Sequence, residues 1–148
     1  MPKTKLTILT VDDEEIIRNL IHSFLSKIGY SSILASNGED AIDSAAKEKP
    51  DIVLLDIKMP QMDGHSVCKR LRELPSHSKT MGIIMITGYG SLDNKERAVV
   101  SGADDLMEKP LDLYELIHRI KVWGEVREIK DPIERISTYA FRIREYKK

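Results

Sequence analysis

The chain has a single cysteine, Cys68, among 148 residues, which excludes a disulfide framework. It lacks any apolar run near the roughly 20 residues that a membrane span needs. Its first residues, Met-Pro-Lys-Thr-Lys, also lack the apolar region of a signal peptide. The formal net charge is −1, so no basic field of the whole chain favours nucleic acid. These absences predict a cytoplasmic protein that binds neither membranes nor nucleic acid directly.

Short apolar runs alternate with longer segments of helical spacing as far as about residue 123. The apolar runs cover residues 6–11, 31–35, 52–56, 83–87 and 105–108, and the helical segments cover 14–28, 39–47, 65–74, 92–101 and 112–123. Five strand–helix units in a row predict a parallel sheet with helices on both faces. In such sheets the site lies at the carboxyl ends of the strands.

Five polar residues end or follow the predicted strands. They are Asp12, Asp13, Asp56, Thr87 and Lys109. The carboxyl ends of parallel strands meet at one rim, so we expect these side chains to lie together. Three crowded carboxylates repel one another unless one is protonated or a cation binds between them. The cation that suits such oxygen ligands is Mg²⁺.

This combination of groups suits phosphoryl chemistry. A carboxylate beside Mg²⁺ can act as a nucleophile toward phosphorus, and Asp56 is the expected nucleophile. Lys109 would contact one phosphoryl oxygen, and Thr87 would hydrogen-bond another. Each residue alone has an ordinary explanation: Asp12 as a helix N-cap, Asp56 in an Asx turn, and Thr87 as a strand residue. Their joint placement at strand ends favours the functional interpretation.

Four motifs, in order, carry a family resemblance. They are Val-Asp-Asp-Glu-Glu from residue 11, Leu-Leu-Asp-Ile-Lys-Met-Pro-Gln-Met-Asp-Gly from residue 54, Thr-Gly from residue 87 and Glu-Lys-Pro from residue 108. Over roughly residues 5–123 the chain resembles the receiver domain of two-component response regulators, including the chemotaxis regulators. The resemblance implies a flavodoxin-like, doubly wound sheet of order 2-1-3-4-5 flanked by five helices. The domain would span residues 1–123, and a helical extension would span 124–148.

The resemblance also implies a function. Asp56 would accept a phosphoryl group from a sensor histidine kinase or a histidine phosphotransfer protein, and Thr87 and Lys109 would hold it. The helix at 14–28 would dock the kinase. The domain would be a signalling switch and not an enzyme, apart from its own phosphorylation and dephosphorylation. Its fourth helix, fifth strand and fifth helix would pass the signal to a downstream protein partner or to a second copy of the chain.

The metal ligands come from the same resemblance, from which the chain departs at two positions, one of them Leu111 after Lys-Pro, where Phe is common. Asp13, Asp56 and the backbone carbonyl of Lys58 would bind Mg²⁺ directly, and Asp12 would help mostly through water. Receivers often carry Tyr or Phe three residues before the lysine, as a rotamer switch that reports movement of the threonine. Here that position is Leu106. We therefore expect the fourth and fifth helices to repack by aliphatic contacts.

Three other functions compete with this hypothesis. A receiver-like adaptor would bind partners without being phosphorylated. A dehalogenase-type phosphohydrolase would carry a second Asp two residues after its nucleophile, where this chain has Lys58. A flavin binder would need a hydroxyl-rich phosphate loop after the first strand, where this chain has the acidic Val-Asp-Asp-Glu-Glu. A zinc site is not expected, because the four histidines show no ligand spacing.

The tail beyond residue 123 has its own pattern. Asp131 and Pro132 predict the start of a separate helix, with Asp131 as its N-cap. Apolar residues recur at spacings of three and four: Val126, Ile129, Ile133, Ile136, Ala140 and Ile143. The stripe predicts packing against the domain or a dimer contact, and it could instead lead into a further domain.

Overall fold

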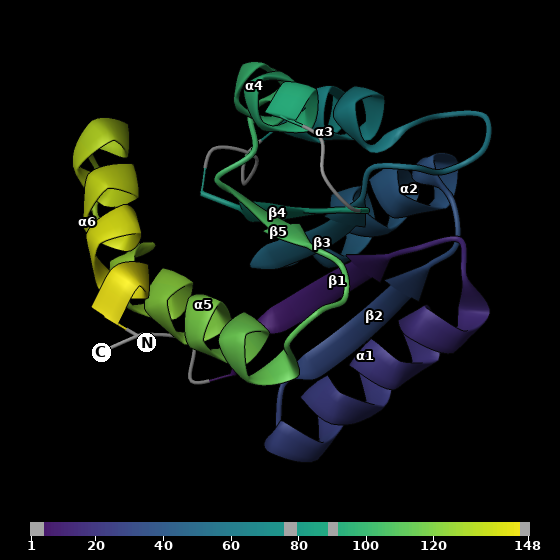
Figure 1. Ribbon diagram of the computed structural model, residues 1–148, viewed down its shortest axis with the longest axis horizontal. Helices are drawn as coiled ribbons and strands as arrows, with labels where there is room; N and C mark the ends of the chain where they lie inside the picture. Colours follow the sequence, from purple (N-terminus) through teal and green to yellow (C-terminus); the bar gives the residue numbers. More distant parts are fainter. Residues whose placement is uncertain (1–4, 76–79, 89–91, 146–148) are drawn as a thin grey trace. The chain divides into compact units, whose positions relative to one another are not determined.

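A five-stranded parallel sheet forms the centre of the computed structural model, which describes residues 5–75, 80–88 and 92–145. The strands are β1 (Thr7–Val11), β2 (Ser31–Ala35), β3 (Ile52–Asp56), β4 (Gly82–Thr87) and β5 (Asp105–Glu108). Their order is β2-β1-β3-β4-β5, which confirms the predicted fold (Figure 1). Each predicted strand agrees with the structure to within one residue at either end.

The described residues also form six helices. They are α1 (Glu15–Ile28), α2 (Gly38–Glu48), α3 (Gly64–Arg72), α4 (Leu92–Ser101), α5 (Leu113–Val126) and α6 (Pro132–Arg144). Within the described residues, none of them is both long and apolar enough to cross a membrane. The chain divides into two compact units, residues 1–110 and 111–148. The first unit therefore holds the whole sheet and four of the helices.

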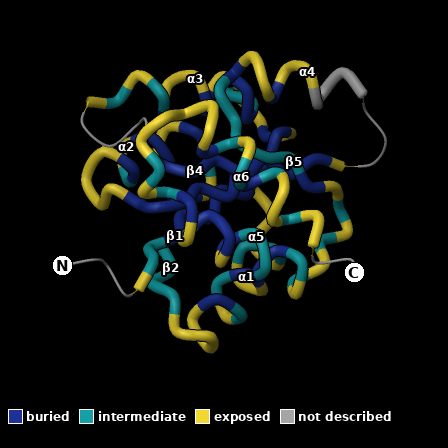
Figure 2. The backbone as a smooth tube through the Cα atoms, turned by 90° about the vertical axis from the view of Figure 1, so that its left-hand side faces the viewer, coloured by how far each residue is buried: buried dark blue, intermediate teal, exposed yellow. Residues whose placement is uncertain are grey.

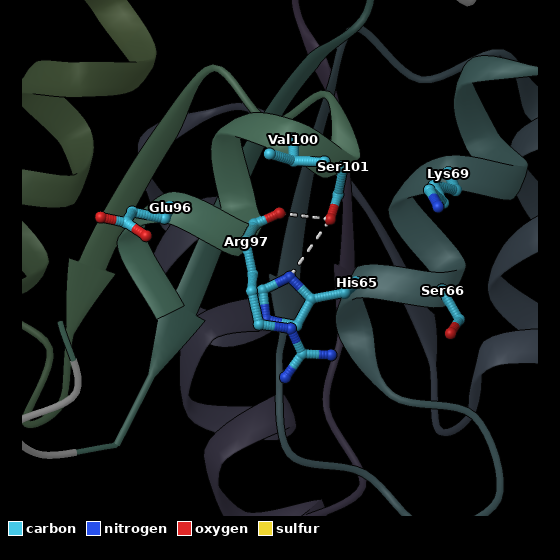
Figure 3. A pocket seen from close by; sticks show the side chains of 7 residues that line it. All are labelled: His65, Ser66, Lys69, Glu96, Arg97, Val100 and Ser101. Atoms are coloured by element: carbon cyan, nitrogen blue, oxygen red, sulfur yellow. Dashed lines mark hydrogen bonds between the residues drawn. The ribbon is translucent and has the colours of Figure 1, made fainter. Parts of the chain in front are cut away.

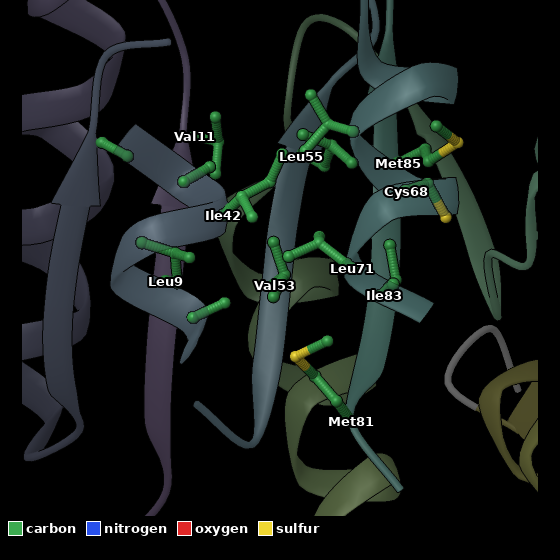
Figure 4. Packing of buried hydrophobic residues seen from close by; sticks show 14 of the residues in the cluster. Leu9, Val11, Ile42, Val53, Leu55, Cys68, Leu71, Met81, Ile83 and Met85 are labelled. Atoms are coloured by element: carbon green, nitrogen blue, oxygen red, sulfur yellow. The ribbon is translucent and has the colours of Figure 1, made fainter. Parts of the chain in front are cut away.

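In the first unit, helices cover both faces of the sheet because strand side chains alternate between the faces. Leu9, Val53 and Ile83 point to one face, where they join a buried cluster with α2, α3 and α4 (Figure 4). The helix α1 lies on the opposite face (Figure 1). Strands β3 and β4 are buried along their whole length, while the outer turns of the helices are exposed (Figure 2). Cys68 lies inside the cluster, as expected of a small buried hydrophobe.

The second unit consists of α5 and α6. Asp131 caps α6 by accepting a hydrogen bond from the Ile133 N–H, which confirms the predicted helix start. The buried residues of α6 are Arg135 and Tyr139, whereas Ile133 is 75% exposed. Ile133 therefore does not belong to the buried face of this unit, so at this position the apolar stripe does not pack within the unit. The reason lies at Trp123, whose ring makes an edge contact with Tyr139 and lies 5.9 Å from the Arg135 guanidinium carbon.

One glycine controls how α3 meets the sheet. The Gly64 N–H donates to the Ile57 carbonyl at 2.8 Å, so the helix starts directly beside the end of β3. A Cβ at position 64 would lie 2.6 Å from the Asp56 carbonyl oxygen and 2.7 Å from the Ile57 Cα. Both neighbours are backbone atoms that cannot rotate away. Only glycine therefore permits this approach.

The Gly64→Ala variant is expected to unfold more easily, because the added methyl group forces backbone atoms of α3 and β3 apart. Overpacking of this kind costs about 1–3 kcal/mol. Urea titration would measure the loss. Gly88→Ala is the matched control, since nothing lies within 4 Å of a Cβ there, and its effect should stay within about 0.5 kcal/mol. Equal effects at the two positions would contradict the close-approach argument.

Candidate functional site

Three carboxylates meet at the carboxyl end of the sheet. Val11 of β1 pairs with Leu55 of β3, so the residues that follow each of them lie side by side. Asp12, Asp13 and Asp56 each bring a carboxylate oxygen to within 4.8 Å of the others. Asp12 and Asp56 are only 2% and 3% exposed, whereas Asp13 is exposed. The structure thus brings together the three acids that the strand pattern selected.

Lys109 brings a positive charge to these acids. Its backbone N–H donates to the Thr87 carbonyl at 2.8 Å, directly after β5, and the Lys109–Pro110 peptide bond is cis. Its Nζ lies 3.5 Å from Asp56 Oδ2 and 3.6 Å from Asp12 Oδ2. Burial alone would lower the pKa of Lys109, but the Asp56 and Asp12 carboxylates raise it above the usual value. The ammonium therefore stays charged and partly neutralises the acids.

Thr87 is the last residue of β4 and is 3% exposed. Asp56 is aligned with Ile86 on β4, which puts Thr87 one position beyond Asp56 along the rim. The predicted hydroxyl therefore lies at the end of the strand between those that carry Asp56 and Lys109. All five predicted side chains follow or end strands at the same rim.

Asp56 is the electrostatically unusual group. Desolvation raises the pKa of its carboxyl group to about 6, and the charge of Asp12 adds to the effect. Lys109 opposes this shift, as does a hydrogen bond from the backbone N–H of Lys58. The carboxylate therefore carries its charge at neutral pH, but the protein holds that charge at a cost. A bound cation would relieve this cost.

Backbone groups orient both buried acids. Asp12 Oδ1 accepts a hydrogen bond from the Glu14 N–H at 2.9 Å, two residues further along the chain. The N-cap of α1 is Glu14, without a side-chain cap, so the N-cap alternative for Asp12 is wrong. The Arg18 guanidinium donates to the Asp12 carbonyl at 2.8 Å, a role that the sequence did not reveal. Its position one helical turn after Glu14 is the signal that could have indicated it.

Comparison with known proteins shows which family the chain belongs to. The model of the response regulator receiver domain matches residues 8–121. The chain belongs to this family. It is 40% identical over 125 residues to the alkaline phosphatase synthesis transcriptional regulatory protein PhoP of Bacillus subtilis (strain 168), covering 84% of this chain and 51% of PhoP. The receiver thus spans about half the length of the curated relatives it matches.

Solved receiver domains share the fold. A CheY-like response regulator receiver domain protein from Methanospirillum hungatei JF-1 has a TM-score of 0.79 and 29% identity, covering 86% of this chain and 100% of that one. The receiver domain of sensor histidine kinase PA1611 from Pseudomonas aeruginosa PAO1 has a TM-score of 0.75 and 26% identity, covering 82% and 99%. That structure holds a magnesium ion coordinated in its active-site cleft.

The acids of this receiver fit a hard divalent cation. Among the described residues, one ammonium, that of Lys109, pairs with this group of three carboxylates, so negative charge is in excess. All the donors are oxygen atoms, and Mg²⁺ prefers oxygen over nitrogen or sulfur ligands. The exposed Asp13 leaves one side of the group open to water, which Mg²⁺ keeps in its coordination shell.

In EDTA, Asp56→Asn is expected to raise the free energy of unfolding at pH 7. The pKa of the Asp56 carboxyl is 3.8 in its ordinary environment and about 6 in the fold. Its contribution to stability is therefore present below pH 4 and lost as the pH rises through about 6. Removing the carboxylate is therefore expected to raise the free energy of unfolding by up to about 3 kcal/mol at pH 7.

Urea titrations of both proteins between pH 4 and pH 7.5 would measure this difference. The gain from Asp56→Asn should shrink as the pH falls toward 4. A gain of the same size at every pH would contradict the electrostatic origin.

Proposed function

We propose that this receiver accepts a phosphoryl group on Asp56 and acts as a phosphorylation-controlled signalling switch. One observation carries the proposal: the buried Asp56 carboxylate lies within 4.8 Å of two further acids and 3.5 Å from the Lys109 ammonium. Structural ion pairs seldom collect two buried acids around one ammonium, because burying each charge costs desolvation energy. The arrangement suits binding of a cation and capture of a phosphoryl group.

In the proposed reaction, an Asp56 carboxylate oxygen attacks phosphorus and forms an acyl phosphate. The bond from phosphorus to the donor breaks, and its electron pair leaves with the donor, a histidine nitrogen on a kinase or phosphotransfer protein. Lys109 holds one phosphoryl oxygen by its charge, and the Thr87 hydroxyl hydrogen-bonds another. Mg²⁺ supplies positive charge that neutralises the transferred oxygens. We assign its direct ligands as Asp13, Asp56 and the Lys58 backbone carbonyl, with Asp12 acting mostly through water.

The partners are also proposals. Ile16 and Leu20 of α1 are 85% and 56% exposed, and they follow the acidic residues closely along the chain. We assign this helix to kinase docking, because exposed aliphatic residues beside a charged site suit a transient protein interface. PhoP is a transcriptional regulatory protein about twice as long as the matched region, so the output could also pass to a segment outside this receiver. The proposed location is the cytoplasm.

The route of output could include a second copy of the chain. On the second unit, Ile133 and Phe141 of α6 are 75% and 65% exposed. They lie eight residues apart on the side of the helix away from the buried Arg135 and Tyr139. We retain residues 1–123 as the proposed receiver and 124–148 as an extension that supports partner or dimer contact. A receiver-like adaptor that works without phosphorylation is the alternative.

Incubation with Mg²⁺ and acetyl phosphate is expected to add one phosphoryl group to the parent protein and none to Asp56→Asn, because only the parent retains the nucleophile. Intact-mass measurement would detect the gain, and a sizing column would report any dimer. Acetyl phosphate donates through a P–O bond and releases acetate. A folded parent that gains no mass, with this donor or with a phosphohistidine protein, would favour the adaptor.

Magnesium should stabilise the parent more than an Asp13→Asn variant. At about 100 times its Kd, a ligand that binds only the folded state adds about 2.7 kcal/mol to the free energy of unfolding. Thermal unfolding with and without Mg²⁺ would measure the gain. Glu15→Gln is the control, since it removes an exposed acid of α1 that lies outside the group of three. An equal loss of the magnesium effect in both variants would argue against the assigned site.

A further inference from the structure

Many receivers carry an aromatic residue that transmits the signal, and this chain has an aliphatic residue at that position. Leu106 of β5 stands where an aromatic switch is common, and it packs, half-buried, against the hydrophobic cluster. Movement of Thr87 therefore has no aromatic ring at this position to carry it toward α4. A different connection from Asp56 to α4 runs through the start of α3.

The start of α3 touches both the proposed phosphoacceptor and α4. Gly64 lies against the Asp56 and Ile57 backbone, so no side chain separates the helix from the end of β3. Asp63, on one side of Gly64, makes an ion pair with Arg97 of α4 at 3.7 Å. His65, on the other side, is hydrogen-bonded to Ser101 of α4, with Nδ1 and Oγ 3.2 Å apart (Figure 3). A displacement at the end of β3 would thus reach α4 through both residues.

The hydrogen bonds place a hydrogen on one ring nitrogen of His65. The Ser101 hydroxyl donates its hydrogen to the Arg97 carbonyl at 2.5 Å, so its oxygen must accept from His65. A hydrogen of the His65 ring therefore lies on Nδ1. The other ring nitrogen, Nε2, is buried and has no hydrogen-bond partner among the described residues. Leaving a buried polar nitrogen unsatisfied costs free energy, so this arrangement of His65 is not optimal by itself.

There is room for a second arrangement. A cavity of about 350 Å³ lies between α3 and α4, and His65, Lys69, Glu96 and Arg97 are among the residues that line it. His65 and Arg97 both line this cavity (Figure 3). Arg97 is largely exposed, so it can move without breaking core contacts. If it did, Nε2 would gain access to water or to a hydrogen-bond partner in the cavity. A packed helix pair with an unsatisfied atom and adjacent space can change between two states at low cost.

We propose that His65 is a positioning residue that couples phosphorylation of Asp56 to α4 through its hydrogen bond with Ser101. Phosphorylation displaces the end of β3 and the start of α3, the His65–Ser101 bond breaks, and the carboxyl end of α4 shifts. The inference rests on the proposed function of Asp56. The signal would then pass from Asp56 to α4 without an aromatic side chain at position 106.

Two variants remove the coupling without touching the phosphoacceptor site. Ser101→Ala deletes the hydroxyl, and His65→Leu replaces the imidazole by an apolar group that leaves no buried nitrogen unsatisfied. Both proteins should be phosphorylated by acetyl phosphate to the same extent as the parent by intact mass. The change in amide chemical shift on phosphorylation should be retained at Asp13 and Lys58, but should fall at least twofold at residues 99–103. His65→Leu should keep the parent's thermal midpoint, which separates coupling from a merely structural role.

Thr138→Ala is the matched control, because Thr138 also donates its hydroxyl hydrogen to a carbonyl four residues earlier but belongs to α6, outside the α3–α4 pair. Its residues 99–103 should respond like the parent's. Parent-like responses of these residues in either folded variant would overturn the coupling while leaving the phosphorylation of Asp56 intact. A parent that is not phosphorylated would overturn the proposed function, and the coupling with it. If Ser101→Ala does not fold, His65→Leu alone decides.

Discussion

The repulsion among Asp12, Asp13 and Asp56 is the constraint around which this receiver is organised. Two of these acids are buried, and together they hold more negative charge than the single Lys109 ammonium offsets. The sheet tolerates this because its order places β4 between β3 and β5, so a lysine that follows β5 can reach across to the acids. Desolvation and the charge of Asp12 together raise the pKa of the Asp56 carboxyl, and Lys109 offsets only part of this rise. Excess negative charge of this kind attracts a divalent cation, and the proposed phosphoryl transfer depends on such a cation.

The same constraint extends into the backbone. Asp12 is held by the Glu14 N–H and, through its carbonyl, by Arg18, so α1 is connected to the acids on one side. Gly64 brings α3 against the end of β3 on the other side. Asp63 and His65 then connect α3 to α4. A change of charge at Asp56 would therefore affect α1, α3 and α4, although these helices contain none of the charged residues of the site.

The sequence predicted the strands well because burial on both faces produces continuous apolar runs such as residues 52–56. The gathering of the five polar residues followed from strand ends alone. The sheet order did not follow from periodicity, and it came from the family resemblance. The His65–Ser101 bond could not be predicted, because it depends on how α3 and α4 pack and no spacing encodes that. The buried face of α6 was missed for a related reason: a charged residue, Arg135, is buried there by its carbonyl and ring contacts.

The close approach of Gly64 has a further consequence for the segment 57–63 that precedes it. Its two ends are joined by the hydrogen bond from the Gly64 N–H to the Ile57 carbonyl. Asp63 at its far end also caps α3 by accepting from the Ser66 N–H. The loop is short, and the Met62 N–H also donates to the Pro60 carbonyl within it at 2.8 Å. Short, internally bonded loops are much more sensitive to a change of length than long flexible ones. The length of this loop is thus as constrained as the identity of its residues, so grafts and tags belong elsewhere on the receiver.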